Sequence, residues 1–315
     1  MKLIKRFSSL SPIYSGGLTN HVPMMITALH KMGVSKSDIE LICENYVREN
    51  EIPDLHDQYY PNIPFEDEYI SLTNKYINVI LEFGIDKTVH DFLQDMQFSL
   101  ESGLYHGLIR LYYALLQGKD ELLVAQALSY FYLMSKEYIV DGSYKTSIDS
   151  FTDLVEYRKN LDYTFKSFVS LEKFEELLEI PGISSRLFRL EDISNKENQL
   201  VDLFVKQFLQ TRDFYILHVI TGFQALHALK CYFDDYEDVL NMFFTKAQVL
   251  MVLNDYKEIY TEILNESDFS DPIEIGELQD AHDIKLLRTC YYLRDELKNE
   301  EIKKVISYLK EKTSL

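Results

Sequence analysis

The stretch Ser102–Gly118 places three chemically capable side chains on one face of an apolar helix. At about 100° per residue, His106, Arg110 and Tyr113 fall in one stripe, while leucines occupy the other faces. A helix that is apolar nearly all round is buried, and unpaired buried polar groups cost roughly 1–3 kcal/mol each. These three side chains are therefore either satisfied within the core, as a structural histidine and arginine would be, or they belong to a site.

Two other predicted helices each carry a pair of histidines nine residues apart, His21 with His30 and His218 with His227. Nine residues correspond to about 900° of helical rotation, so the two members of each pair point to opposite sides. Each helix can thus direct only one histidine toward a shared interior site. The face of His218 also holds small residues that let another element approach closely: Thr221, Gly222 and Ala225. We therefore expect His218 to be functional and His227 to be structural or at the surface.

A predicted helix near residues 280–297 carries His282 and Lys285 on one face, because residues three apart are neighbours on a helix. Two interpretations of this lysine stay open. If burial lowers its pKa, the neutral amine becomes a nucleophile or adds carbon dioxide. Alternatively, its stem is buried and its amine reaches an edge, where it pairs with Asp283 or Glu277.

Composition excludes several classes of partner. The net charge of −19 and the pI of about 4.8 leave no basic surface for a phosphate backbone or an anionic membrane. The three cysteines (Cys43, Cys231 and Cys290) are far apart and form no C-x-x-C motif, which is typical of reduced thiols. The sequence has no run of 18 apolar residues and no signal-peptide core. We expect a soluble cytoplasmic protein.

The chain predicts an all-α fold, a multi-helix bundle with a buried site between helices. Residues 1–18 are expected to form an irregular arm and residues 19–315 a single helical domain. Thr19 or Asn20 is expected to cap a helix that ends at Gly33, and Ser37 to cap the next. The stretch 141–200 is more polar and should hold only short helices. Further helices are expected near 68–83, 87–98, 102–117, 119–139, 212–231, 235–254, 256–265 and 280–297.

Four blocks of this sequence, in order, resemble the questin oxidase-like family. They are Thr19–Gly33, Tyr105–Arg110 followed by Tyr113, Leu217–Gly222, and Asp280–Lys285. The resemblance spans roughly residues 14–295 and is least recognisable over 141–200. It implies a helical oxygenase that inserts oxygen into a polycyclic aromatic phenol or quinone and opens a ring. Its partners would be the small aromatic substrate and O2, and the oligomeric state is left open.

Members of this family are described both as NADPH-requiring Baeyer–Villiger-type oxidases and, in one branch, as iron-dependent dioxygenases with histidines and a carboxylated lysine. The sequence has no G-x-G-x-x-G after a strand, so a Rossmann-type site is not expected. This favours the metal, Fe(II) or another divalent transition ion, over NADPH. Carried over from the resemblance, the metal ligands are His21, His106, His218 and His282, with a carbamate on Lys285.

Within that interpretation, Arg110 and Tyr113 would stabilise a phenolate or a developing oxyanion, and the alternative for Arg110 is a buried ion pair. Two other functions compete with the oxygenase. One is a non-catalytic helical interaction protein, in which the histidines only pack. The other is an HD-type metal phosphohydrolase, suggested by His-Asp dipeptides at 56–57, 90–91 and 282–283. The four proposed ligands should converge, whereas His30, His56, His90 and His227 should not.

Overall fold

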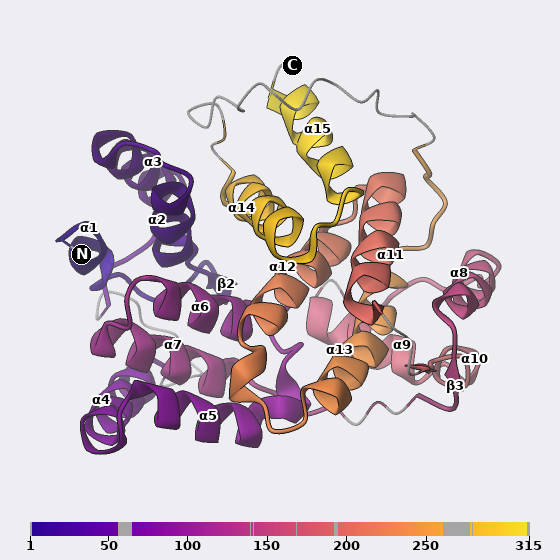
Figure 1. Ribbon diagram of the computed structural model, residues 1–315, viewed down its shortest axis with the longest axis horizontal. Helices are drawn as coiled ribbons and strands as arrows, with labels where there is room; N and C mark the ends of the chain where they lie inside the picture. The colour runs from indigo at the N-terminus through magenta and orange to yellow at the C-terminus, as the bar shows by residue number, and fades with distance from the viewer. Residues whose placement is uncertain are drawn as a thin grey trace.

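The computed structural model describes residues 2–55, 65–138, 140, 142–167, 169–191, 195–260, 278 and 280–313. Within these ranges the chain is helical, as expected, and its only strands form two sheets of two short strands each (Figure 1). One sheet pairs β1 (Ile13–Tyr14) with β2 (Leu18–Thr19) in antiparallel orientation. The other pairs β3 (Lys145–Thr146) with β4 (Arg189–Leu190) in parallel.

The first half of the chain forms α1 (Lys2–Phe7), α2 (Val22–Lys31), α3 (Lys36–Glu49), α4 (Phe65–Phe83), α5 (Ile85–Met96), α6 (His106–Leu116) and α7 (Glu121–Met134). The second half forms α8 (Phe151–Lys159), α9 (Ser170–Leu178), α10 (Pro181–Ser184), α11 (Lys196–Thr211), α12 (Phe214–Ala228), α13 (Tyr236–Met251), α14 (Ala281–Leu297) and α15 (Ile302–Thr313). Three short 3₁₀ turns are η1 (Gln97–Ser99), η2 (Ile148–Ser150) and η3 (Lys230–Tyr232).

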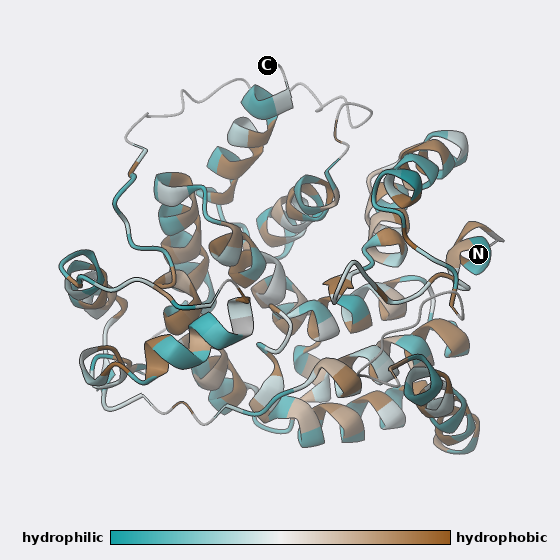
Figure 2. Cartoon of the chain, turned by 180° about the vertical axis from the view of Figure 1, so that it is seen from behind, coloured by the Kyte–Doolittle hydropathy of each residue, from teal (hydrophilic) through white to brown (hydrophobic). Residues whose placement is uncertain are grey.

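Four helices from distant parts of the sequence surround one region of the interior. Helix α6 packs against α2, α7 and α12, while α14 packs against α2, α12 and α15. In Figure 1, α2 of the N-terminal part and α14 of the C-terminal part lie above α6 and α12, which are near the middle of the molecule. A continuous apolar core extends around them from Leu3 to Leu309, and Figure 2 shows apolar residues along the inward sides of the helices.

Two glycines allow α6 to approach its neighbours closely. A Cβ on Gly222 of α12 would lie 2.6 Å from Cγ of Tyr105, immediately before α6. A Cβ on Gly107 would lie 2.5 Å from the ring of Phe131 on α7. The close approach expected on the His218 face of α12 is therefore present, and Tyr105 is the residue that occupies it.

Several expected boundaries are wrong. Residues 1–18 are not wholly irregular, since they contain α1 and β1. Helix α3 begins after Ser35, not Ser37, because Ser35 Oγ accepts a hydrogen bond from the backbone N–H of Asp38. Asn20 does satisfy the first turn of α2, since its side chain accepts from the N–H of Val22 at 3.0 Å.

The stretch 141–200 holds short helices, as expected: α8, α9 and α10. Helix α11 is 16 residues long, begins at Lys196 and extends over residues 201–211, for which no helix was expected. Its buried residues recur at helical spacing between polar ones, from Leu200 through Phe204 to Phe208. The helix expected near 256–265 is absent over 256–260, where Tyr256 has a left-handed φ of 56°. Residues 261–265 lie outside the described ranges.

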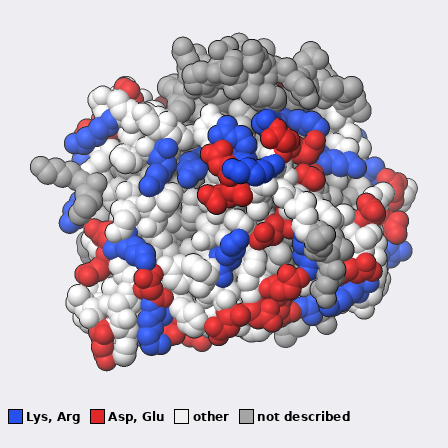
Figure 3. All heavy atoms as spheres, viewed as in Figure 1, with Lys and Arg blue, Asp and Glu red and all other residues white. Residues whose placement is uncertain are grey.

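Charge on the surface is mixed. Figure 3 shows a face on which Lys and Arg are interspersed with Asp and Glu, and acidic side chains run along its lower edge. Among the residues described on that face, basic side chains form no broad patch. Within the described part of the chain, no helix has the combination of length and apolar character needed to cross a bilayer.

Candidate metal centre

Four histidine side chains meet where α2, α6, α12 and α14 converge. They form what we call the histidine cluster: His21, His106, His218 and His282. The first is the N-cap of α2, the second begins α6, the fourth is the second residue of α14, and the third lies one turn into α12. Each histidine lies near the start of its helix, and the four helix starts meet at one place. Residues far apart in the sequence are therefore brought together there.

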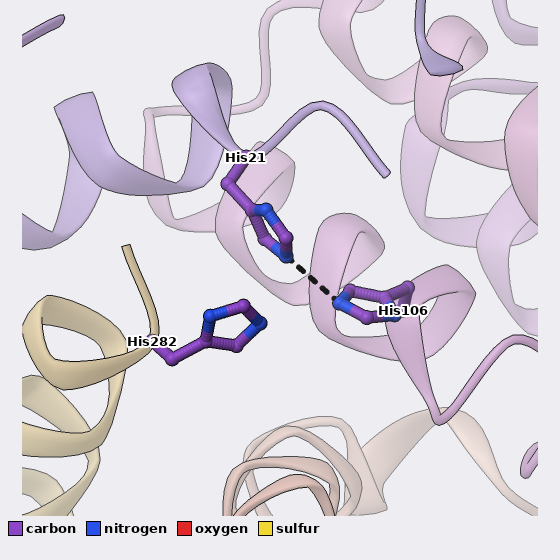
Figure 4. Close-up of side chains that lie close together, drawn as sticks. All are labelled: His21, His106 and His282. Carbon is purple, nitrogen blue, oxygen red and sulfur yellow. Dashed lines mark hydrogen bonds between the residues drawn. The ribbon is translucent and has the colours of Figure 1, made fainter. Parts of the chain in front are cut away.

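The cluster is compact (Figure 4). His21 Nε2 lies 2.9 Å from His106 Nε2. Ring centroids are 4.7 Å apart for His21 and His282, 4.8 Å for His106 and His218, and 5.1 Å for His218 and His282. Ligand atoms of His21, His106 and His282 all lie within 4.8 Å of one another. Such spacing places several imidazole nitrogens around one point.

The remaining histidines lie elsewhere, as the helical phases predict. His227 faces away from the cluster and contacts Tyr292 through Nδ1 at 2.9 Å and Lys230 through Nε2 at 3.2 Å. His30 is exposed, and His90 pairs at the surface with Asp91 and Asp234. His56 lies outside the described residues.

Hydrogen bonds fix the proton position in three rings of the cluster. His106 Nδ1 donates to the carbonyl of Gly103 at 2.5 Å, and His218 Nδ1 donates to the carbonyl of Phe214 at 2.8 Å. His282 Nδ1 lies 3.2 Å from the Asp280 carboxylate. All three partners accept only, so each Nδ1 carries the proton and each Nε2 presents a lone pair.

The fourth ring is oriented by a chain of side chains from α3. His21 Nδ1 lies 3.0 Å from the hydroxyl of Tyr46, which lies 3.3 Å from the hydroxyl of Tyr14. Tyr14 donates to Oδ1 of Asn50 at 3.1 Å, and the Asn50 amide is held by donating to the Tyr46 carbonyl at 2.9 Å. Tyr46 therefore donates to Tyr14 and accepts from His21 Nδ1. His21 Nε2 also presents a lone pair.

This arrangement is incomplete without a positive species at its centre. With both Nδ1 atoms protonated, His21 and His106 bring two lone pairs to within 2.9 Å. Nε2 of His218 and of His282 are buried and have no hydrogen-bond partner among the described residues. Imidazole nitrogens bound to one divalent ion at about 2.1 Å lie about 3.0–3.4 Å apart. The donor set and its spacing therefore fit a transition-metal ion.

Electrostatics keep the rings neutral. Burial lowers the pKa values of His21 and His106 well below the usual range, and a charge on Lys285 would lower them further. Burial and the nearby His106 do the same to the pKa of His218. Burial also lowers the pKa of His282, although the hydrogen bond to Asp280 opposes it. Neutral imidazole is the form that binds a metal.

Lys285 lies at the same centre. Its side chain is fully buried, its amine has no hydrogen-bond partner in the described part of the chain, and burial lowers its pKa to about 7. The alternative pairing with Asp283 is wrong, because that carboxylate contacts Lys312 at 2.6 Å. Glu277, the other proposed partner, lies outside the described residues. Near neutral pH a substantial fraction of the amine is therefore neutral, and in that form it is a nucleophile.

Arg110 and Tyr113 occupy different surroundings. Arg110 is buried, donates to the carbonyl of Asn20 at 3.4 Å and lies 4.9 Å from the ring of Tyr130. Among the described residues it has no carboxylate partner, so the buried ion pair expected as its alternative is not formed there. Tyr113 lies about 10 Å along α6 from His106 and, with Arg110, lines a cavity of about 20 Å³, room for one water molecule. Its buried hydroxyl forms no hydrogen bond to any described residue.

Sequence reasoning missed Phe214 and Tyr46. The Phe214 ring lies 4.3 Å from that of His218 and 5.1 Å from that of His282, yet it is 47% exposed. The His282 side chain is 22% exposed, whereas the other three cluster histidines are buried, so the cluster opens on this side. The i, i+4 spacing from Phe214 to His218 was a usable signal. Nothing local in the sequence connects Tyr46 to His21.

A strained turn sets the position of His106. Gly103, Leu104 and Tyr105 all have left-handed φ values, of 57°, 57° and 62°. For residues with a side chain, this conformation costs on the order of 1–3 kcal/mol. It explains why the helix expected over 102–117 begins only at His106. The turn brings the Gly103 carbonyl under His106 Nδ1 and the Tyr105 ring against Gly222.

The His-Asp dipeptides do not form a phosphohydrolase-type centre in the described chain. Asp91 lies at the surface with His90, and Asp283 contacts Lys312 instead of the cluster. The dipeptide at 56–57 lies outside the described residues.

No protein-family model matches the chain, and no curated protein is similar to it.

Proposed function

We propose that this protein is a metal-dependent oxygenase in which the histidine cluster holds Fe(II) or another divalent transition ion. The observation that carries the proposal is the uniform orientation of the four rings. Every Nδ1 lies beside an oxygen that accepts its proton, which leaves every Nε2 lone pair available to a metal. Ligand atoms of His21, His106 and His282 lie within 4.8 Å of one another, and the His218 ring lies 4.8 Å from that of His106. Imidazole ligands suit iron, copper, nickel and zinc. The resemblance of the four sequence blocks to the questin oxidase-like family supports iron among these.

A bound ferrous ion would supply the one-electron chemistry that O2 requires. The protein's own contribution would be to hold the four imidazoles in one tautomer and to exclude water from three of them. Asp280 and Tyr46 act behind two of the ligands, where an acceptor raises the basicity of the metal-binding nitrogen. The small sheets of the described chain offer no dinucleotide-binding fold, which supports the metal-dependent alternative over the NADPH-dependent one.

Lys285 would complete the centre as a carbamate. The neutral amine attacks the carbon of CO2, an N–C bond forms, one C=O electron pair moves to oxygen, and an amine proton passes to solvent. The product carries an anionic oxygen where the described cluster residues offer none. Full burial, the absence of a hydrogen-bond partner within the described ranges and a pKa of about 7 support this step. The helix N-termini that meet here favour a negative charge.

The substrate would be a planar phenol or quinone that enters beside Phe214. That ring is half exposed and contacts two of the proposed ligands, tilted against His218 and edge-on to His282. Aromatic faces in offset or edge contact contribute about 0.5–1.5 kcal/mol beyond area burial. Arg110 is placed behind Asn20 and His21, where its positive charge would favour a phenolate at the centre. Tyr113 has no described contact with the cluster, so its proposed role depends on the resemblance alone.

Metal reconstitution tests the proposal. Metal-free, untagged protein would be titrated with Fe(II) without oxygen, then mixed with O2 and 1,8-dihydroxyanthraquinone. We expect one ion per chain and oxygen uptake that needs both metal and phenol.

The chain has no tryptophan, so Phe214→Trp provides a single fluorescent reporter beside the cluster, with Phe83→Trp at an exposed position as the control. Metal should quench the fluorescence of Phe214→Trp and leave that of Phe83→Trp unchanged. Equal quenching in both variants, or no stoichiometric metal binding, would favour the alternative of a non-catalytic interaction protein.

A further inference from the structure

The strained turn before His106 is held from α13, a helix that supplies none of the cluster histidines. The turn consists of Gly103, Leu104 and Tyr105, whose left-handed φ values persist only where the surrounding structure imposes them. Because His106 follows the turn directly, the residues that fix the turn also aim the His106 ring. The contacts between α13 and this stretch can therefore control the geometry of the metal centre.

Lys246 of α13 fixes the segment that leads into the turn. Its ammonium donates to the carbonyl of Phe98 in η1 and, at 2.7 Å, to Oε1 of Glu101. The Lys246 and Glu101 side chains are only 5% and 3% exposed, so water competes little for either contact. One buried cation thus holds two points of the chain immediately before the turn.

Backbone hydrogen bonds carry this restraint from Glu101 to His106. The N–H of Tyr105 donates to the Glu101 carbonyl at 3.2 Å, and the N–H of His106 donates to the Gly103 carbonyl at 3.2 Å. The same Gly103 carbonyl accepts from His106 Nδ1 at 2.5 Å. The position of Glu101 therefore helps to set the position of the carbonyl that orients the His106 ring.

A second residue of α13 supports the end of the turn. Phe243 lies three residues before Lys246, on the same face of the helix. Its ring lies 4.7 Å from that of Tyr105, which also packs against Gly222 of α12. Helix α13 thus holds the turn at its start by a charged contact and at its end by an aromatic one.

We propose that Lys246 is a positioning residue of the metal centre, which holds the stretch 98–105 so that Nε2 of His106 points into the histidine cluster. Side chains of a binding site must be held within about 0.5 Å of their productive positions, so a loosened turn should weaken metal binding. The effect of Lys246 on metal affinity rests on the proposed function. Its effect on the His106 ring is a property of the metal-free fold and can be measured separately.

Two variants of the full chain isolate Lys246. Glu101→Gln keeps an oxygen acceptor for the ammonium, so we expect the turn to stay in place. Glu101→Gln combined with Lys246→Met removes the ammonium without leaving a buried carboxylate alone.

NMR of metal-free protein labelled with ¹⁵N-histidine reads the result. The short hydrogen bond of His106 Nδ1–H should give a strongly downfield proton resonance in the wild type and in Glu101→Gln. In the double variant this resonance should move upfield or disappear. The Nδ1–H resonance of His218, which donates to Phe214 on another helix, should stay in all three proteins.

Metal affinity measures the consequence of the displaced ring. Competition with a chelator should show at least about a tenfold loss of Zn²⁺ affinity in the double variant relative to Glu101→Gln. The control is Lys196→Met combined with Glu237→Gln, because Lys196 is equally buried and ties α11 to α13. Glu237 lies about 13 Å along α13 from Lys246, so this control should keep the wild-type affinity.

Three results would overturn the positioning role of Lys246. They are an unchanged His106 resonance in the double variant, loss of the His218 resonance together with that of His106, and an equal loss of Zn²⁺ affinity in the control. If the wild type binds no Zn²⁺, the proposed function fails, and the His106 resonance alone decides whether Lys246 positions the ring.

Discussion

The histidine cluster and the Lys246–Glu101 pair are both buried and polar, but they satisfy their groups in different ways. In the pair, a donor meets an acceptor of opposite charge at 2.7 Å. In the cluster, four acceptor nitrogens, the histidine Nε2 atoms, lie close together, and the Lys285 amine forms no hydrogen bond to any of them in the described chain. The pair can be stable by itself, whereas the cluster needs a cation. A buried polar group therefore indicates a ligand when its neighbours share its hydrogen-bonding character.

Removal of a proposed metal ligand should have the largest effect on the histidine cluster. His106→Ala should weaken divalent-metal binding more than about 100-fold, since even outer partners of metal ligands contribute 10–100-fold. His227→Ala is the matched control, because that ring is equally buried but faces away from the cluster. Competition with a chelator measures both. Equal affinities for the two variants would mean that His106 is only a packing residue.

Substitution of Lys285 should give the next largest loss of metal binding. Lys285→Ala should weaken metal binding and abolish oxygen uptake, and Lys285→Arg should fail as badly, because it keeps the charge but cannot form a carbamate. Added acetate should partly restore the alanine variant. Full metal content and activity in the arginine variant would rule out the carbamate.

The same lysine has a pH signature in the metal-free protein. Its pKa is about 7 when folded and about 10.4 when unfolded, so the unfolded chain binds more protons between these values. This group therefore adds stability as pH rises from about 7 to 10. Denaturant titrations should show that Lys285→Met removes this part of the slope. An unchanged slope would mean that the amine is solvated.

Breaking the charged pair should destabilise the fold itself. Lys246→Met leaves Glu101 buried and alone, and loss of one partner of a buried pair costs about 3–5 kcal/mol. The Glu101 pKa is already raised to about 7, and a raised carboxyl pKa makes stability fall as pH rises through it. Thermal unfolding should therefore show a larger loss at pH 8 than at pH 5. A pH-independent loss would indicate a packing defect instead.

The smallest loss of metal affinity is expected for the tyrosine hydroxyls that lie behind His21. Tyr46→Phe removes the acceptor of His21 Nδ1 and should reduce metal affinity about tenfold. Tyr14→Phe, one step further along the chain of hydroxyls, should have less effect. Metal affinities measured under identical conditions compare the two. A larger loss for Tyr14→Phe would contradict the donor order inferred here.

Sequence reasoning located what depends on local geometry. Helical phase separated His21 from His30 and His218 from His227, because rotation per residue is set by the backbone. It also placed Lys285 beside His282. It could not locate Tyr46, whose contact with His21 joins two helices, or the left-handed turn before His106, where tertiary packing against Gly222 overrides helical propensity. It missed α11 because polar residues there mask the apolar spacing.

The central claim is that four neutral imidazoles present their Nε2 lone pairs to one cation, and nitrogen NMR of ¹⁵N-histidine-labelled protein tests it most directly. In the metal-free protein, the account predicts four rings protonated at Nδ1, with the Nε2 resonances of unprotonated imidazole. One equivalent of Zn²⁺, a diamagnetic substitute, should shift those four Nε2 resonances together and leave His227 unchanged. Protons on the Nε2 atoms, or a zinc response that spares the cluster, would contradict it.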